Sequence, residues 1–222
     1  MPKISAVIIT FNEEKYIERC ISSLEGIADE IVVVDSFSTD RTEDLCIRSG
    51  VKFTKHKFNG YIEQKNYAMS LAAFPWIISL DADEALSDEL RKSILEIRND
   101  LEYDGYIFNR LNNYCGKWIR HSRWYPDRHL RLFDSTKGKW AGTNPHDTFT
   151  MNRGSKVIRL KGDILHWNYA SIEEHWDKVN RFSTISANEY FKVGRKAGLL
   201  TAHIHLAWSF FRSYVLTGGF LE

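Results

Sequence analysis

Cysteine is scarce in this chain of 222 residues, which has three: Cys20, Cys46 and Cys115. They are widely spaced, and no CxxC pair or His/Cys cluster suggests a zinc site. An odd number of cysteines in a chain without a secretory leader fits a reducing cytosol. We therefore expect a cytoplasmic protein in which Cys20 packs on the apolar face of the first predicted helix.

Signals for export, membrane insertion and nucleic-acid binding are also missing. Residues 1–12 lack a basic region followed by a long apolar core, and no window holds about eighteen uninterrupted apolar residues. The segment 199–222 comes nearest, but His203, His205 and Arg212 interrupt it. The formal net charge is +1, so the field of the whole chain does not favour nucleic acid. We expect no transmembrane helix and no nucleic-acid partner.

Apolar β-forming runs alternate with helical patterns through about residue 98. Strands are expected at 4–10, 30–35, 51–55 and 76–80, and helices at about 12–24, 38–50, 61–73 and 87–98. Asn12 is expected to cap the first of these helices and Ser87 the last. The alternation predicts an α/β fold with a mostly parallel central sheet that is flanked by helices.

The pattern changes after residue 100. Short strands are expected at 105–111, 129–134 and 157–167, and helices at about 171–194 and 200–217. We expect one domain over residues 1–168, whose halves meet near residue 98, followed by a C-terminal helical appendage over 169–222.

Polar side chains stand at, or one step past, the carboxyl ends of three expected strands: Thr10, Asp35 and Asp81. Ligands of open parallel sheets bind outside this edge. Asp81 and Asp83, one residue apart, can converge on a divalent cation, since Mg²⁺ and Mn²⁺ prefer oxygen ligands. The alternative is a solvated, acid-rich loop before a helix. The position of Asp35 at a strand end indicates a functional role, whereas we interpret Asp40 as a helix cap.

The ordered set of motifs resembles one family. The stretches "ITFNEEKYIERCISSL", "EIVVVDSFSTDRTEDL" and "QKNYAMSLAAFPWIISLDADE" are similar to family 2 glycosyltransferases, which have the nucleotide-sugar-binding fold called GT-A. The resemblance covers residues 4–98 strongly and continues more loosely through "RHLRLFDSTKGKWAGTNPHD". This later part is most similar to bacterial lipopolysaccharide core glycosyltransferases that add glucose or heptose.

The resemblance implies a role for each matching residue. The half over about 1–98 would bind the nucleotide, and the half over about 99–168 the acceptor. The residues of the nucleotide site would be Thr10, Asn12 and Glu13 at its border, Asp35 on the uracil, Lys65 and Asn66 on the base or diphosphate, and Asp81 on the ribose. Asp83 would be the direct ligand of Mg²⁺ or Mn²⁺, with Asp81 beside it.

Transfer with inversion also needs a carboxylate that removes the acceptor proton. Asp147 is the first candidate; relatives usually show His-Glu where this chain has His146-Asp147, and Asp127 and Glu84 are weaker candidates. His146 and His166 are expected either to complete the metal shell or contact phosphate, or else to pack as ordinary core residues. Of Arg128 and Arg131, one is expected to face inward and pair with phosphate.

The implied activity is inverting transfer of a sugar, with UDP-hexose as the expected donor, to a glycan or lipid-linked acceptor of the bacterial surface. The alternative is a non-catalytic nucleotide-sugar-binding or membrane-associated scaffold. Three other enzyme classes fit the sequence less well. A dehalogenase-type phosphatase would carry its nucleophilic Asp on the first strand, whereas the acidic pair here follows the fourth. A dinucleotide oxidoreductase needs a G-x-G-x-x-G motif after the first strand and a nucleotidyltransferase usually opens with a Gly-rich basic loop, and this chain has neither.

The C-terminal segment places Ile204, Trp208, Phe211 and Val215 at helical spacing after the basic residues Lys192, Arg195 and Lys196. Such a helix either lies on an anionic membrane surface, here the inner membrane, or docks on its own domain or on a second subunit as a homodimer. The basic stretch 110–131 would then meet phosphates of a lipid-linked acceptor.

Overall fold

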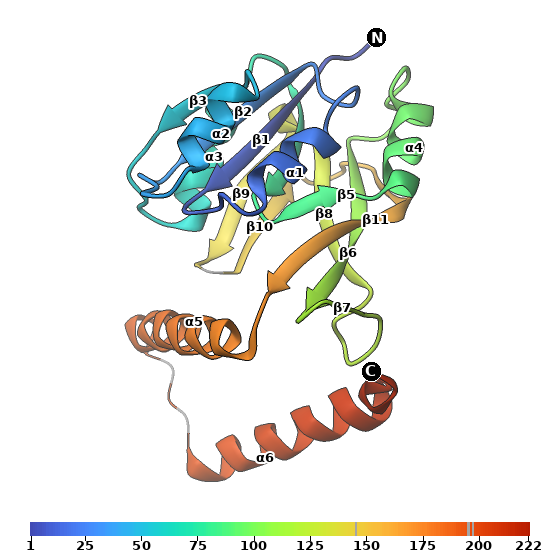
Figure 1. Ribbon diagram of the computed structural model, residues 1–222. Helices are drawn as coiled ribbons and strands as arrows, with labels where there is room; N and C mark the ends of the chain where they lie inside the picture. The colour runs from blue at the N-terminus through green and yellow to red at the C-terminus, as the bar shows by residue number, and fades with distance from the viewer. Residues whose placement is uncertain (145, 195, 197) are drawn as a thin grey trace. The chain divides into compact units, whose positions relative to one another are not determined.

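The structure, a computed structural model, describes residues 1–144, 146–194, 196 and 198–222, without the side chains of His146 and Glu189 (Figure 1). The first elements are β1 (Ile4–Thr10), α1 (Ile17–Ser23), β2 (Glu30–Asp35), α2 (Thr42–Arg48), β3 (Lys52–Lys55), α3 (Tyr61–Ser70), β4 (Trp76–Asp81), β5 (Glu84–Leu86) and α4 (Asp88–Ile97). They confirm the predicted alternation of strands and helices.

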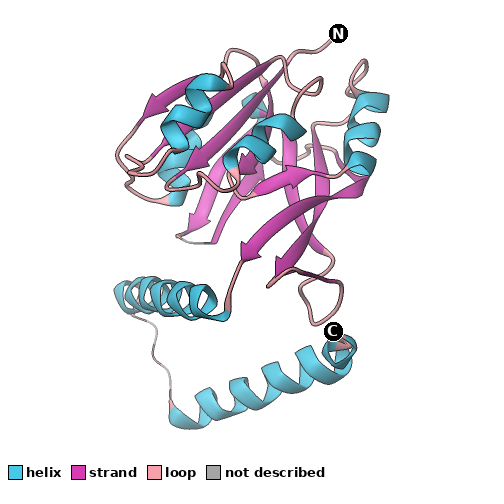
Figure 2. Ribbon diagram, in the orientation of Figure 1, coloured by secondary structure: helices cyan, strands magenta, loops and turns pink. Residues whose placement is uncertain are grey.

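Strands, magenta in Figure 2, dominate the next part of the chain, whose described residues over 98–171 include one short 3-10 helix, Ser135–Lys137, and no α-helix. It comprises β6 (Gly105–Tyr114), β7 (Lys117–Ile119), β8 (Asp127–Asp134), β9 (Gly138–Thr143), β10 (His146–Met151) and β11 (Val157–Tyr169). The chain then forms α5 (Ile172–Lys192) and α6 (Leu199–Phe210), and α6 continues into a π-helical segment, Phe211–Leu216. None of the described helices is both long enough and apolar enough to cross a membrane.

A nine-stranded sheet within the described residues follows the order β3-β2-β1-β4-β8-β6-β11-β5, with β7 paired to β6. Its first four strands are parallel, as predicted, and β8 and β5 join by antiparallel pairing to β4 and β11. The sheet is therefore mixed. Thr10 lies opposite Asp35 and Ile9 opposite Asp81, so the ends of β1, β2 and β4 lie side by side at one edge.

Each face of the parallel strands has its own core, because alternate side chains point to opposite faces. In β1, Ile4, Ala6 and Ile8 pack with residues of α1, α2 and α4, whereas Val7 packs with α3, β9 and β10. Cys20 of α1 is fully buried in the first core, as expected. Helices cover one face of the parallel strands, and α3 with the β9–β10 hairpin covers the other.

The chain divides into two compact units. Unit 1 comprises 1–109 and 128–166, and unit 2 comprises 110–127 and 167–222. Strands β6 and β11 each run from one unit into the other. The domain boundary that we expect at residue 168 stays a prediction.

Two local expectations are wrong. Asn12 does not cap α1, which begins five residues later; it adopts a left-handed conformation with φ of 56°. Residues 84–86, for which no strand is expected, form β5 and pair with Ile164–His166 of β11. A three-residue strand owes its formation to its partner, which lies about eighty residues away, so its own sequence carries little signal.

Candidate functional site

The shared edge of β1, β2 and β4 carries the predicted polar residues. The Thr10 hydroxyl is buried, and its Oγ1 has no hydrogen-bond partner among the described residues. Buried hydroxyl groups are normally paired, so an unpaired one at the ligand-binding edge of a sheet is suited to meet a bound molecule.

The environment of Asp35 differs from the expectation that its carboxylate faces a ligand outside the strand ends. The residue is fully buried, and its carboxylate accepts hydrogen bonds from Ser38, from the backbone N–H at 2.8 Å and from the hydroxyl. Ser38 Oγ in turn accepts from the N–H of Asn12 at 2.8 Å, and Asn12 Oδ1 accepts from the N–H of Thr39 at 2.8 Å. Asp35 and Asn12 therefore order the loop after β2, and their contacts with a nucleotide stay predictions.

The start of α2 is held from the loop after β1. The N–H of Glu13 donates to Thr42 Oγ1 at 2.8 Å, and the N–H of Glu14 donates to Asp40 Oδ2 at 3.0 Å. Asp40 Oδ1 also accepts from the N–H of Thr42, the first residue of α2, at 3.0 Å. Burial raises the pKa of Asp40, but these hydrogen bonds outweigh burial and lower it below its ordinary value. Asp40 thus bonds the first residue of α2, as a cap would, although the N-cap position itself is Arg41.

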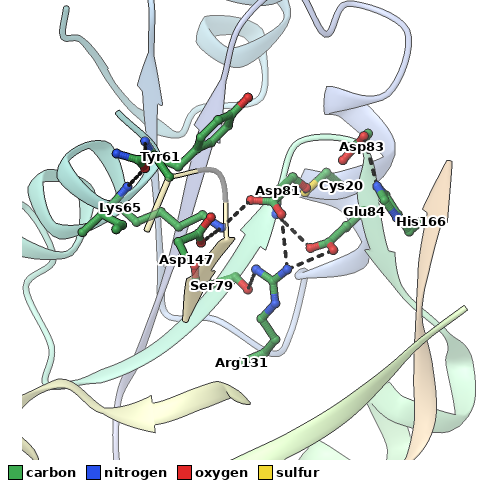
Figure 3. A network of polar contacts seen from close by, with 12 residues as sticks. Cys20, Tyr61, Lys65, Ser79, Asp81, Asp83, Glu84, Arg131, Asp147 and His166 are labelled. Atoms are coloured by element: carbon green, nitrogen blue, oxygen red, sulfur yellow. Dashed lines mark hydrogen bonds and ion pairs between the residues drawn. The ribbon is translucent and has the colours of Figure 1, made fainter. Parts of the chain in front are cut away.

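The acidic turn, residues 81–84, is held by one buried arginine (Figure 3). Arg131 Nη2 lies 3.2 Å from Asp81 Oδ2 and 3.1 Å from Glu84 Oε1, and Nη1 donates to Ser79 O at 3.3 Å. Glu84 Oε2 accepts from the N–H of Asp81 at 2.9 Å, which closes the turn. Of the two arginines considered, Arg131 is the inward one, and Arg128 is exposed.

This arrangement corrects two expectations. The inward one of Arg128 and Arg131 was expected to pair with phosphate, but the guanidinium of Arg131 pairs with carboxylates of its own chain. Glu84 is 1% exposed and paired to Arg131, so it is unsuited to meet an acceptor as a base.

Charge in this region is set by burial and by the acids. Burial lowers the pKa of Arg131, but Glu84 and Asp81 outweigh burial and raise it above its ordinary value. Burial raises the pKa of the Cys20 thiol well above its ordinary value, and the neighbouring acids of the turn raise it further. Arg131 therefore stays cationic and Cys20 stays a neutral thiol whose Sγ lies 3.6 Å from Asp81 O.

Asp83 points to a histidine. His166 Nε2 of β11 lies 3.3 Å from Asp83 Oδ2, and the pairing of β5 with β11 sets His166 opposite Glu84 (Figure 3). Two neighbouring ligands of one octahedral cation at about 2.1–2.3 Å stand about 3.0–3.2 Å apart. The Asp83–His166 separation therefore fits two ligands of a divalent cation.

The described residues contain no group of three or more His, Cys, Asp or Glu side chains that could enclose a metal by themselves. A cation that bridges protein and phosphate needs only one or two protein ligands, because phosphates and water supply the rest. An Asp83–His166 pair fits such a shared cation and not a closed structural site.

Lys65 of α3 connects the acidic turn to Asp147. Its Nζ lies 2.7 Å from Asp147 Oδ2 and 3.1 Å from Asp81 Oδ1 (Figure 3). The same Nζ lies 4.6 Å from the centroid of the Trp140 ring, and Lys65 is 4% exposed. The buried ammonium group compensates part of the charge of the two carboxylates, and the aromatic face adds to its stabilisation.

The β9–β10 hairpin, which carries Asp147, is fastened to α3. Asn66 Nδ2 donates to Trp140 O at 3.0 Å, and its Oδ1 accepts from the N–H of Trp140 at 3.1 Å. Asn144 Oδ1 accepts from the N–H groups of Tyr61 and Ile62 at 3.0 and 3.2 Å, and so caps the helix. Asn66 thus has a structural role, and its predicted contact with the base or diphosphate stays a prediction.

Asp127, the other weaker candidate for the base, belongs to unit 2, where Arg110 Nη2 lies 2.7 Å from its Oδ2. This ion pair gives no support to a role of Asp127 as the base, and that role stays a prediction. The side chain of His146 lies outside the described residues, so its predicted role is not addressed.

Sequence reasoning missed the contacts of Glu84, Asn144 and Trp140. An Asn in a hairpin turn and a Glu after an Asp-x-Asp motif are both common, so neither residue type is a signal alone. The spacing Arg128-x-x-Arg131 was visible, but only the pairing of β4 with β8 shows which arginine faces inward.

The chain is similar in sequence and in fold to known proteins. A family model described as "Glycosyl transferase family 2" matches residues 5–158. An uncharacterized glycosyltransferase of Rickettsia typhi is 32% identical over 233 residues, covering 100% of this chain and 79% of the relative. The lipopolysaccharide core biosynthesis glycosyltransferase LpsC of Rhizobium meliloti is 33% identical over 205 residues, covering 88% of this chain and 75% of the relative.

Solved structures agree on the architecture. TarS of S. aureus (residues 1–349) superposes with a TM-score of 0.56 at 17% identity, over 98% of this chain and 74% of that chain. This likeness supports the GT-A fold that the sequence resemblance implies. The family model covers more than half of the chain, and the chain therefore belongs to glycosyl transferase family 2.

Proposed function

We propose that this chain is a metal-dependent, inverting glycosyltransferase that moves a hexose from a UDP-sugar to a glycan or lipid-linked acceptor in lipopolysaccharide core synthesis. The observation that carries the proposal is the meeting of the ends of β1, β2 and β4, with Asp83–His166 and Lys65–Asp147 beside them. The name of LpsC supports the acceptor class, and TarS was crystallised in complex with UDP (TM-score 0.53, 18% identity).

The donor would lie along the edge of the parallel strands. Thr10 offers its unpaired hydroxyl to the nucleotide, while Asp35, Asn12 and Glu13 shape the loops on either side. Asp83 and His166 would hold Mg²⁺ or Mn²⁺, with Asp81 beside them. When bound, the cation neutralises charge that grows on the departing diphosphate.

Asp147 would act as the base of an inverting displacement. The acceptor oxygen bonds to the anomeric carbon as the bond from that carbon to the diphosphate oxygen breaks. The acceptor proton passes to the Asp147 carboxylate, and the electron pair leaves with the nucleoside diphosphate. Before this step, Asp147 must share or lose its contact with Lys65.

Lys65 provides the means for that exchange. Its ammonium group is shared between Asp147 and Asp81, so a diphosphate that arrives beside Asp81 gives it a third, more highly charged anion. We infer that donor binding draws Lys65 toward the diphosphate and makes the Asp147 carboxylate available to the acceptor.

Lys65→Met should lower kcat/KM for the donor by about a hundredfold, because it removes a buried positive charge from the departing diphosphate. Lys65→Arg keeps the charge and should retain more activity than Lys65→Met. Steady-state release of UDP measures both. An unchanged KM and kcat in Lys65→Met would remove Lys65 from the donor site.

The function itself is tested by thermal unfolding of the purified chain with a panel of nucleotide sugars, with and without Mn²⁺. The matching UDP-sugar at about a hundred times its Kd should add about 2.7 kcal/mol to the unfolding free energy, and only with the metal. Stabilisation without any transfer or hydrolysis of the donor would favour the scaffold alternative. Indifference to every nucleotide sugar would refute donor binding.

A further inference from the structure

The C-terminal helix of unit 2 exposes an apolar surface. None of the described residues of α6 or of the following π-helical segment is buried. Their large apolar side chains are between 45% and 83% exposed: Leu199, Leu200, Ile204, Leu206, Trp208, Phe210, Phe211, Tyr214, Val215 and Leu216. This exposure leaves a surface on unit 2 that water solvates poorly.

The exposed helix is amphipathic. Thr201, His205, Ser209 and Arg212 follow one another at intervals of four, four and three residues, which aligns them in one polar stripe. The wider remaining arc is mostly apolar, with His203 and Ser213 as its polar residues, and carries two aromatic pairs, Trp208–Phe211 and Phe210–Tyr214, with ring centroids 6.1 and 5.3 Å apart. Aromatic side chains of this kind are enriched at the boundary between lipid and water.

Charge on the same unit favours an anionic partner. Unit 2 holds ten Lys and Arg residues against six Asp and Glu, while unit 1 holds twenty against twenty-three. From Tyr190 to Leu221 the sequence has four basic residues, among them Lys192, Lys196 and Arg212, and no acidic residue. A polybasic segment beside an apolar helix is attracted to anionic lipid headgroups.

We propose that the apolar arc of α6 lies on an anionic membrane surface, with Lys192, Lys196 and Arg212 at the level of the headgroups. A second copy of the chain would present the same basic charge to this surface, whereas anionic lipid neutralises it. The inference stands on the exposure and charge of unit 2 and does not depend on the proposed function.

The proposal is tested by co-sedimentation of the full chain with vesicles at low salt. Vesicles of phosphatidylcholine containing about one third phosphatidylglycerol should bind the protein, and pure phosphatidylcholine vesicles should bind it more weakly. Added salt should weaken binding because it screens the headgroup charge. Failure of the wild-type chain to sediment with the anionic vesicles would overturn the proposal.

Two sets of variants separate the apolar and basic contributions. Trp208→Ala/Phe211→Ala should weaken binding to the anionic vesicles at least about tenfold. Lys192→Glu/Lys196→Glu should weaken it by a similar factor, with a smaller dependence on salt. The control Ile47→Ala/Leu95→Ala removes two side chains of unit 1 that are 60% and 46% exposed, and should leave binding unchanged.

Two further measurements complete the test. All variants should unfold at the same temperature as the wild type without any ligand, which shows that they fold whether or not the chain binds a UDP-sugar. If sedimentation equilibrium instead shows a dimer that Trp208→Ala/Phe211→Ala disrupts while vesicle binding is unaffected, a second copy and not lipid covers the helix.

Discussion

Asp83→Asn is expected to slow the proposed sugar transfer by at least about a thousandfold, because it removes the carboxylate that we propose as a ligand of the cation while keeping the size of the side chain. The carboxylate that faces His166 Nε2 at 3.3 Å becomes a neutral amide, which binds a divalent cation weakly. Initial rates of UDP release over a range of Mn²⁺ concentrations measure the effect.

The dependence on metal distinguishes a ligand from a residue that merely supports the turn. In Asp83→Asn, the concentration of Mn²⁺ needed for half-maximal rate should rise, and the stabilisation by UDP-sugar with Mn²⁺ should fall. His166→Gln should shift the same two quantities in the same direction but less, since the first ligand keeps its charge. Asp100→Asn, an exposed acid just beyond α4, is the matched control and should behave as wild type. Wild-type rates and metal dependence in Asp83→Asn would place the cation elsewhere.

The positions of Thr10, Asp35 and Asp81 at strand ends could be predicted from the sequence because they depend on local patterns. Apolar runs that end in Thr10, Asp35 and Asp81 predict buried parallel strands, and parallel strands that are neighbours bring their carboxyl ends together. The register in the structure confirms that these three ends meet. The pairing of β1 with β4 joins segments that are far apart in the chain, and the alternation of strands and helices predicts that they share a sheet but not that they are neighbours.

The contacts of the site could not be predicted, because they join segments that are far apart in the chain. His166 reaches Asp83 only because β5 pairs with β11, and β5 is too short to carry its own signal. Asp147 reaches Lys65 only because the hairpin packs on α3. Sequence reasoning therefore assigned Asp147 its candidate role by resemblance, without a geometric reason.

Asp35 lies at the end of a strand, as predicted, but its carboxylate is buried and not exposed to a ligand as expected. Ser38 follows Asp35 by three residues, and this spacing allows the Asp35 carboxylate to accept hydrogen bonds from the N–H and the hydroxyl of Ser38. Such local bonds close the loop and remove the carboxylate from solvent. The strand pattern predicts where Asp35 stands but not whether its oxygens face outward.

Arg131→Met should lower the free energy of unfolding by about 3–5 kcal/mol, because it leaves the buried Glu84 carboxylate beside Asp81 without a compensating charge. Arg131 is 2% exposed, and its guanidinium lies 3.1 Å from Glu84 Oε1 and 3.2 Å from Asp81 Oδ2. Chemical denaturation of the protein without nucleotide measures the change.

The double variant Arg131→Met/Glu84→Gln separates the unpaired charge from the lost packing. A glutamine carries no charge and its side-chain oxygen can still accept the N–H of Asp81, so much of the lost stability should return. Arg128→Met, three residues earlier on β8 and exposed, is the matched control and should change stability by less than about 0.5 kcal/mol. A loss in Arg131→Met no larger than in that control would mean that the acidic turn holds its shape without the buried arginine.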